Sequence, residues 1–228
     1  MKKILLATHN ENKLREYQEI LAPLGYEVYG DKDFGISYDP EENGTTYAEN
    51  AYIKAKALRK LVNMPVIADD SGIEIKALGE HFPGIHTSRY ASSISSDYRV
   101  VGQHIIDLLK DASDRSAEYH CCICLLEEED ATPLYFEGIC RGHILEKIGG
   151  YHGFGYDPIF HYDEGNLDFG DCSEEEKNAI SHRSRALQKL LHYLALRQGQ
   201  QHSENEESLG GQISRHDDQF AFFDLFSI

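Results

Sequence analysis

The chain has 228 residues, of which 41% are hydrophobic and 27% are charged, and its 39 acidic and 22 basic side chains give a formal net charge of −17. A chain of this length buries roughly 70% of its unfolded surface, so it forms a core without the help of disulfides. The negative charge excludes a protein that wraps duplex nucleic acid through a broad basic surface, whereas an anionic small molecule can bind where a few cations gather.

The N-terminal part of the chain alternates apolar runs with amphipathic segments. Residues 2–7 form a short apolar run that is typical of a buried strand, and 26–29 form a second one. Between them, apolar side chains at helical spacing predict a helix over 13–24. A loop rich in Asp, Glu, Pro and Gly over 31–46 then precedes a helix over about 47–62.

The middle of the chain is predicted to contain a strand, a turn and a helix. The apolar run 65–68 indicates a buried strand, which ends at the turn-like sequence Asp-Asp-Ser-Gly over 69–72. Apolar and polar residues alternate over 73–77, which indicates a further extended piece. Apolar spacing predicts a helix over 96–110.

The C-terminal half begins with two apolar segments, 117–126 and 134–145, which predict a central strand and its neighbour. A loop rich in glycine and aromatic residues covers 149–160. A capping box at Ser173 opens a helical tract that runs to about Gln198. This mixed order of elements favours an α/β or α+β fold with a largely continuous sheet, and we expect α/β.

The five cysteines form no pair of Cys-x-x-Cys motifs, so we expect buried reduced thiols rather than a zinc site. They are Cys121, Cys122, Cys124, Cys140 and Cys172. No secretory leader opens the sequence, and no apolar stretch reaches the roughly 18 residues of a membrane span. We therefore expect a cytoplasmic protein with no membrane partner.

Residues 199–228 differ in composition from the rest of the chain. They carry six acidic side chains and one basic one, so this extension holds −5 of the −17 and the body holds −12. We expect residues 1–198 to form a single domain and the acidic extension to be partly disordered. Its apolar end, 220–226, either docks on this chain or a partner or has no role.

Two acidic groups are candidate metal ligands. Asp70 follows a predicted strand, and carboxylates at the carboxyl end of a strand point into the crevice where α/β proteins bind ligands. Glu41, Glu42 and Glu49 form a second group ahead of a lysine-bearing helix. Hard oxygen ligands of this kind suit Mg²⁺ held together with substrate phosphates. The alternatives are an ordinary polar turn and a solvated acidic loop.

Cations that suit an anion site follow the first predicted strand. Lys13 lies at the start of the first predicted helix behind Thr8 and Asn10, so a helix N-terminus, a hydroxyl, an amide and an ammonium converge there. Lys54 on the second predicted helix is another candidate, although a solvated helix face would explain it equally. No P-loop sequence occurs in the chain, which excludes phosphate binding by that motif.

The sequence Gly-Phe-Gly-Tyr-Asp-Pro over 153–158 is a candidate base-binding loop. It does not fit the dinucleotide pattern Gly-x-Gly-x-x-Gly, because Pro158 replaces the last glycine. Aromatic faces on a tight turn beside Asp157 suit stacking on a base and hydrogen bonding to its edge. An ordinary loop with an aromatic core is the alternative.

Lys177 and His182 are five residues apart, so on an unbroken helix they would point roughly 140° apart. Both reach one ligand only if the helix breaks, with Ser181 capping a new helix that begins with His182 and Arg183. A surface histidine is the alternative interpretation of His182.

Six motifs, taken together and in order, resemble those of the non-canonical purine nucleoside triphosphate pyrophosphatases, the inosine/xanthosine triphosphate pyrophosphatase family. The resemblance covers about residues 2–197. The motifs are Ala7-Thr-His-Asn10-Glu-Asn-Lys13, Glu42-Asn-Gly-Thr-Thr-Tyr-Ala-Glu-Asn50 with Lys54, Ala68-Asp-Asp-Ser-Gly72, Pro83-Gly-Ile-His-Thr-Ser-Arg-Tyr90, Phe154-Gly-Tyr-Asp-Pro-Ile-Phe160 and Lys177-Asn-Ala-Ile-Ser-His-Arg183.

The resemblance implies a Mg²⁺-dependent hydrolase that splits ITP, dITP or XTP between the α- and β-phosphates, which cleanses the nucleotide pool. It also implies an elongated α/β fold of two lobes, with a long, mixed, strongly twisted sheet flanked by helices and a nucleotide cleft between the lobes. The implied assembly is a homodimer, and the implied ligand is a purine nucleoside triphosphate rather than a nucleic acid polymer.

The resemblance also implies roles for single residues. Asp70 would accept the proton of the attacking water and would bind Mg²⁺ together with Glu42. The implied phosphate-binding residues are Thr8, Asn10, Lys13, Lys54, Ser71 and Arg183. The residues implied around the base are Phe154, Gly155, Tyr156, Asp157, Lys177 and His182.

His9 and Asn12 depart from the family pattern, which usually has glycine at both positions. They would add strain if the turn required positive φ, although no chemical group assigned above is lost. Two alternatives therefore remain open: a nucleotide-binding regulator that has lost turnover, and a hydrolase of other nucleotides such as pyrimidine or modified-base triphosphates.

Overall fold

The structure is a computed structural model that describes residues 2–153 and 155–210. The chain divides into a large unit, residues 1–191, and a C-terminal unit, residues 192–228. The sheet and the candidate site described below lie in the large unit. The expected boundary at residue 198 and the expected partial disorder of the extension stay predictions.

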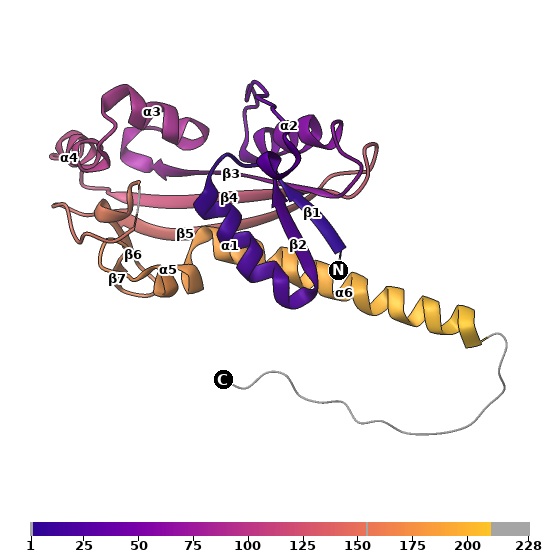
Figure 1. The fold of residues 1–228 in the computed structure, drawn as a ribbon. Coiled ribbons are helices and arrows are strands. Elements are labelled where there is room, and N and C mark those ends of the chain that lie inside the picture. Colours follow the sequence, from indigo (N-terminus) through magenta and orange to yellow (C-terminus); the bar gives the residue numbers. More distant parts are fainter. Residues whose placement is uncertain (1, 154, 211–228) are drawn as a thin grey trace. The chain divides into compact units, whose positions relative to one another are not determined.

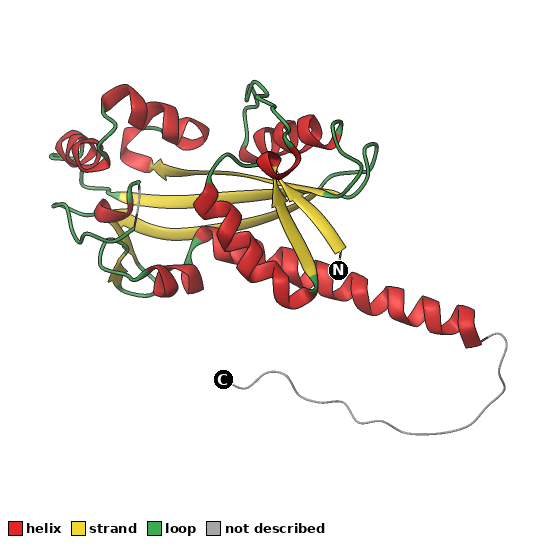
Figure 2. Ribbon diagram, viewed as in Figure 1, coloured by secondary structure: helices red, strands yellow, loops and turns green. Residues whose placement is uncertain are grey.

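The large unit is built on one mixed sheet of seven strands (Figures 1 and 2). The two pairs that β1 forms, with β2 and with β3, are parallel, whereas all pairs from β3 to β7 are antiparallel. In sheet order the strands are β2 (Tyr26–Gly30), β1 (Lys2–Leu6), β3 (Val66–Ile75), β4 (Ser116–Leu126), β5 (Leu134–Ile144), β6 (Phe160–Tyr162) and β7 (Leu167–Asp168). The expected α/β class with a mixed sheet flanked by helices is confirmed.

Helices flank the sheet on both sides. They are α1 (Glu11–Leu21), α2 (Tyr47–Arg59), α3 (Thr87–Ile94), α4 (Tyr98–Leu108), α5 (Glu174–Ile180) and α6 (His182–Gly210). Short 3₁₀ helices cover Ala22–Leu24, Asp31–Phe34, Lys76–Leu78, Gly84–His86 and Asp157–Ile159. In Figure 1, α2, α3 and α4 lie above the long strands β3 to β5, and α5 lies below them.

The predicted strand end at 69–72 is wrong, because β3 continues through this segment to Ile75. β4 pairs with every residue of β3, including Asp69 opposite Ile123 and Asp70 opposite Cys122. The backbone groups of the polar residues therefore find partners in a sheet ladder. Long-range pairing outweighs a local composition that is typical of a turn.

The predicted break between Lys177 and His182 is confirmed. Ser173 and Glu176 form the predicted capping box of α5, and Ser181 separates α5 from α6. The Ser181 hydroxyl accepts a hydrogen bond from the Ser184 N–H at 3.2 Å, as the cap of the new helix should. The prediction of a single helical tract that ends near Gln198 is wrong, because there are two helices and α6 extends to Gly210.

Short elements account for most of the other differences from the predicted pattern. The structure adds α3, β6 and β7, which the sequence did not indicate. Each has eight residues or fewer, which is too short for hydrophobic periodicity to be distinctive. The predicted helices over 13–24, 47–62 and 96–110 are confirmed as α1, α2 and α4, with bounds shifted by a few residues.

Two hydrophobic clusters contain opposite ends of β3. One packs Val66 and Ala68 with α2, β1 and β4. The other packs Ile73 and Ile75 with α4, β4 and the segment that leads to β6. The polar residues 69–72 therefore lie along β3 between two apolar cores.

The five cysteines are buried and free, as expected. Burial raises the pKa of Cys122 to about 12, and the other four thiols shift in the same direction for the same reason. Within the described part of the chain, none of the helices combines the length and the apolarity needed to cross a membrane.

Candidate active site

The candidate site lies where β3 loses its neighbour on one side. β1 pairs with β3 only at Val66 and Ile67, and the next partner on that side is a single bridge between Glu74 and Pro83. Residues 69–72 are therefore bonded to β4 alone across the sheet. Their side chains border an opening next to the end of β1.

Asp69 forms the buried centre of a cation cluster. Its Oδ2 lies 2.8 Å from Nζ of Lys13 in α1 and 3.7 Å from Nε of Arg183 in the first turn of α6. Burial alone would raise the pKa of Asp69, but Lys13, Arg183 and Lys54 outweigh it and hold the pKa well below its usual range. Asp69 is therefore a carboxylate that fixes two cations from separate helices.

Asp70 faces a second set of partners, because successive side chains of a strand alternate between its faces. Its Oδ1 lies 3.3 Å from Nζ of Lys54, and its Oδ2 accepts a hydrogen bond from Nδ2 of Asn50 at 3.3 Å. Nζ of Lys54 also lies 3.1 Å from Oε2 of Glu42. Burial raises the pKa of Asp70 and Glu42 adds to this, whereas Lys54 opposes it, and the net shift is upward.

Glu42 and Asp70 fit a hard divalent cation. Their carboxylates now share one ammonium, that of Lys54, so the local charge of the three groups is −1. Two carboxylates that converge on one small cation form the oxygen donor set that Mg²⁺ takes alongside substrate phosphates. Glu49 does not join them, because its Oε2 accepts hydrogen bonds from the N–H and hydroxyl of Thr45.

The first turn forms the predicted polar N-terminus of α1. The Thr8 hydroxyl accepts from the N–H of Asn10 at 3.1 Å, and the Asn10 side chain accepts from the N–H of Lys13 at 3.3 Å. His9 lies beside Asp31, with Nε2 3.2 Å from Oδ2. Among the described non-glycine residues, positive φ occurs at His81 and Asn166, so His9 carries no such strain.

Two adjoining pockets connect these groups. The smaller has a volume of about 170 Å³ and the larger of about 550 Å³. Lys13, Pro40, Glu42 and Lys54 line both pockets. Thr8 and Asp69 line only the smaller, while Asp70, Ser71, Ser88 and Arg89 line only the larger. Of the predicted phosphate-binding and metal-binding residues, Thr8, Lys13, Glu42, Lys54, Asp70 and Ser71 therefore border one polar opening, whereas Asn10 and Arg183 line neither pocket.

A second buried pair belongs to the predicted base-binding residues. Nζ of Lys177 is hydrogen-bonded to Oδ2 of Asp157, and the Tyr119 hydroxyl donates to Oδ1 of Asp157 at 3.2 Å. The His182 ring stacks on Tyr119 with centroids 4.7 Å apart and an angle of 7° between the planes. Burial, followed by Arg183 and Lys177, lowers the pKa of His182 well below its usual value, so this imidazole is neutral near pH 7.

The aromatic loop over 153–158 does not present Tyr156 as an exposed ring on which a base could stack. Tyr156 is buried, its hydroxyl donates to the carbonyl of Thr87 at 3.2 Å, and its ring packs edge-on against Tyr98. Gly155 has a φ of 66°, which favours glycine at this turn. Phe154 lies outside the described residues. The loop thus contributes Asp157 to the polar site and Tyr156 to the core.

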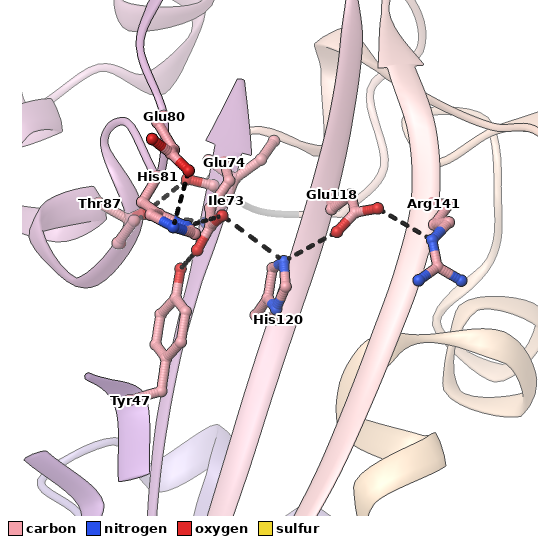
Figure 3. A network of polar contacts seen from close by, with 10 residues as sticks. Tyr47, Ile73, Glu74, Glu80, His81, Thr87, Glu118, His120 and Arg141 are labelled. Atoms are coloured by element: carbon pink, nitrogen blue, oxygen red, sulfur yellow. Dashed lines mark hydrogen bonds and ion pairs between the residues drawn. The ribbon is translucent and has the colours of Figure 1, made fainter. Parts of the chain in front are cut away.

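A polar network across β3, β4 and β5 supports the start of α2 (Figure 3). The Tyr47 hydroxyl donates to Oε1 of Glu74 at 3.2 Å, and the Tyr47 ring stacks on His120 at 5.5 Å. His81 and Arg141 contact the two carboxylates at the ends of the network, those of Glu74 and Glu118. Because Tyr47 opens α2, the network helps to place Asn50 and Lys54 of that helix against β3.

Two glycines allow close backbone contacts at the site. A Cβ on Gly72 would lie 2.2 Å from the carbonyl oxygen of Gly84, and one on Gly138 of β5 would lie 2.0 Å from that of His182. Both distances are shorter than any real Cβ contact, so a larger residue would displace backbone. Gly138 thereby lets the first turn of α6, with His182 and Arg183, lie directly on the sheet.

Several residues of this arrangement were missed from the sequence. Asp69 was assigned no separate role. A continuous strand through this motif would have placed its side chain on the other face from that of Asp70. Asn50 ends the motif that begins at Glu42 but was assigned no role, and Tyr119 carried no distinctive signal. Arg89 lies inside the motif that runs from Pro83 to Tyr90, and its guanidinium donates a hydrogen bond to the Glu42 carbonyl at 3.4 Å.

Together, the fold and the site define an α/β protein whose cleft combines convergent carboxylates with ammonium and guanidinium groups, which suits a polyphosphate with its metal. The sequence profile of the Ham1 family matches residues 4–193, and the chain belongs to this family. The resemblance drawn from the six motifs is thereby confirmed.

Relatives and solved structures agree with this assignment. The chain is 43% identical to the dITP/XTP pyrophosphatase of Treponema denticola over 84% of this chain and 98% of that protein. It is 40% identical to the dITP/XTP pyrophosphatase of Bacillus subtilis over 83% and 96%. A HAM1 protein from Coxiella burnetii superposes with a TM-score of 0.78 and 40% identity, covering 86% of this chain and 99% of that one.

Proposed function

We propose that the chain hydrolyses dITP, ITP and XTP to the nucleoside monophosphate and pyrophosphate, and so cleanses the nucleotide pool. The observation that carries this proposal is the joint placement of Asp70 and Glu42 on Lys54, beside Lys13 in the same opening. Relatives that are about 40% identical over most of their length are dITP/XTP pyrophosphatases, which supports the choice of substrate.

The phosphate end of the substrate would lie along the cations. Lys13 and Lys54 in the pockets, with Arg183 beside Asp69, would spread the triphosphate charge. Thr8 and Ser71 supply hydrogen-bonding groups at the border of the pockets, and Asn10 lies in the same turn as Thr8. Asp69 orients two of the cations from below the opening. Preorganised charge of this kind stabilises the charge that develops as the phosphoanhydride bond breaks.

Glu42 and Asp70 would hold Mg²⁺, which when bound neutralises phosphate charge and polarises the phosphoryl group. Asp70 would also accept the proton of the attacking water. Lys54 favours the ionised form of Asp70, as a base requires, and a bound Mg²⁺ would favour it further. Asn50 holds the second oxygen of Asp70 and so fixes the direction of the carboxylate.

The base end of the substrate would meet Lys177, Asp157 and His182. A 6-oxo purine presents an acceptor where adenine presents an amino donor. A donor such as the Lys177 ammonium, held by Asp157, would favour the acceptor and leave adenine mispaired. The neutral His182 ring offers one donor and one acceptor beside it.

The direct test identifies the products. The chain is incubated with dITP, ITP or XTP and Mg²⁺, and the products are separated by ion exchange. We expect one pyrophosphate for each monophosphate, and no reaction after chelation of the metal. Orthophosphate and a nucleoside diphosphate as first products would contradict the proposal, as would binding of dITP without any turnover.

We also propose that the protein is a cytoplasmic homodimer. The family resemblance supports the dimer, and the five buried free thiols are compatible with a reducing compartment. The mass in solution, measured by light scattering, should be close to twice the 25.9 kDa of one chain. A mass of one chain at micromolar concentration would contradict the dimer.

A further inference from the structure

A group of side chains with the chemistry of metal ligands lies at the opposite part of the sheet from β1. His143 in β5 is paired with His161 in β6, and Asp163 follows β6. Each of the three offers one ligand atom, and these atoms all lie within 4.8 Å of one another. None of the three belongs to the pyrophosphatase site described above, which is built on β3 and the helices around it.

The sheet geometry explains why the three residues meet although they are distant in sequence. Cross-strand pairs place side chains on the same face, so His143 and His161 are neighbours. Asp163 continues the ladder, since its N–H donates to the Arg141 carbonyl at 3.2 Å, and alternation returns its side chain to the face of His161. Gly142 allows close pairing, because a Cβ there would lie 1.8 Å from the His161 carbonyl oxygen.

Existing contacts already orient the ligands. Nδ1 of His161 lies 2.5 Å from Oδ1 of Asp168, which leaves Nε2 for a metal. This histidine–carboxylate pair is the outer contact that metal-binding histidines usually have. Nδ1 of His143 lies 2.6 Å from Oδ1 of Asp163, so a cation binding both atoms would take the place of the proton they share.

The donor set selects the kind of ion. Two imidazoles and one carboxylate suit Zn²⁺ and similar transition metals, whereas Mg²⁺ prefers oxygen ligands alone. Ligands at tetrahedral Zn²⁺ lie about 3.3 Å from one another. The widest separation therefore has to close by up to about 1.5 Å, and the 2.6 Å between Nδ1 of His143 and Oδ1 of Asp163 has to open by about 0.7 Å. The half-exposed side chains of His143 and Asp163 can make both adjustments by rotation.

We propose that His143, His161 and Asp163 form a binding site for one Zn²⁺ ion per chain, with water completing the coordination. The bound ion would tie β6 to β5. The linear spacing of the histidines gave no sign of this site, because its ligands come together only through strand pairing.

The test is calorimetric titration of the untagged full-length chain with Zn²⁺ in excess Mg²⁺, so that the carboxylate site on β3 is already occupied. We expect one Zn²⁺ per chain, and at least about tenfold weaker binding in His143→Ala, His161→Ala and Asp163→Asn. Asp168→Asn should weaken binding by about tenfold, because it removes only the outer contact. His104→Ala on α4 is the matched control and should bind like the wild type.

Circular dichroism of each variant checks that it is folded, and Asp163→Asn, at an exposed position, is the variant least able to disturb the core. In crystals soaked with Zn²⁺, an anomalous peak among the three side chains is the expected result. Absence of Zn²⁺ binding by the wild type, binding unchanged in the folded variants, or a peak located elsewhere would overturn the proposal.

Discussion

At the scale of single residues, two adjacent carboxylates acquire different properties because they point to opposite faces of one strand. Asp69 is enclosed with Lys13 and Arg183, and Asp70 borders the opening with Lys54 and Glu42. The sequence motif contains both acids but does not indicate which one pairs with the buried cations and which one borders the opening. Their division of roles depends on β3 passing through the motif without a turn.

Asp70→Asn should abolish most of the turnover while leaving the fold intact. The amide has nearly the same shape but cannot accept the proton of the attacking water, and general bases contribute about 10²–10⁴-fold to rate. The measurement is kcat for dITP, with Glu80→Gln as control, because the Glu80 side chain is 92% exposed and lines neither pocket of the site. Turnover within fivefold of the wild type would refute the role assigned to Asp70.

Asp69→Asn should cost about 2 kcal/mol of stability at pH 7, because it removes the buried carboxylate that pairs with Lys13 and Arg183, while Arg183 keeps Glu16 at 3.4 Å. The folded pKa of Asp69 is depressed, so its contribution is fully present above the unfolded pKa of about 3.9 and is lost as pH falls through the folded value. Urea unfolding from pH 7 to pH 3 should therefore show a difference in the free energy of unfolding between wild type and variant. This difference should narrow only in acid. A constant difference would contradict this.

At the scale of elements, the long periodic helices and the central strands were predictable from local pattern, as were the capping box at Ser173 and the break at Ser181. The continuity of β3 was not, because the ladder with β4 that holds residues 69–72 involves partners some 50 positions away. Short elements such as α3 depend on packing against the rest of the chain. The close contact between α6 and β5 likewise depends on Gly138, and hydrophobic periodicity does not show where such a contact needs glycine.

Gly138→Ala should lower stability by about 2 kcal/mol and raise KM for dITP. The added Cβ would meet the backbone of His182 and Ala186, which can yield only if the first turn of α6 moves away from the sheet. Chemical denaturation and steady-state kinetics measure the two effects. Gly199→Ala is the control, since nothing lies within 4 Å of its Cβ and alanine favours helix.

At the scale of the whole molecule, the net charge of −17 describes the surface and the extension better than the site. The candidate site gathers Lys13, Lys54, Lys177 and Arg183 around a few carboxylates inside an acidic body. Composition argued against a protein that wraps duplex nucleic acid through a broad basic surface. It could not reveal a local reversal of charge, which arises only when distant segments fold together.

Removal of residues 199–228 should leave turnover within about twofold of the full chain. The Ham1 family profile ends at residue 193, and the site residues all lie before that position. The comparison uses kcat/KM for dITP and the mass in solution of both proteins. A loss of turnover greater than tenfold with the mass unchanged would assign the extension a role in the reaction.

Selectivity for the base is the property that the proposed arrangement of Lys177, Asp157 and His182 predicts most directly. The decisive measurement is kcat/KM for pyrophosphate release from dITP, XTP, dATP and dGTP under identical Mg²⁺. Mispairing of a buried donor or acceptor costs about 1–3 kcal/mol, so dITP and XTP, which carry a 6-oxo group, should exceed dATP by at least about tenfold, whereas a contact to the 6-oxo group alone does not separate them from dGTP. Equal values for all four nucleotides would contradict the claim that this site selects its substrate by the edge of the purine.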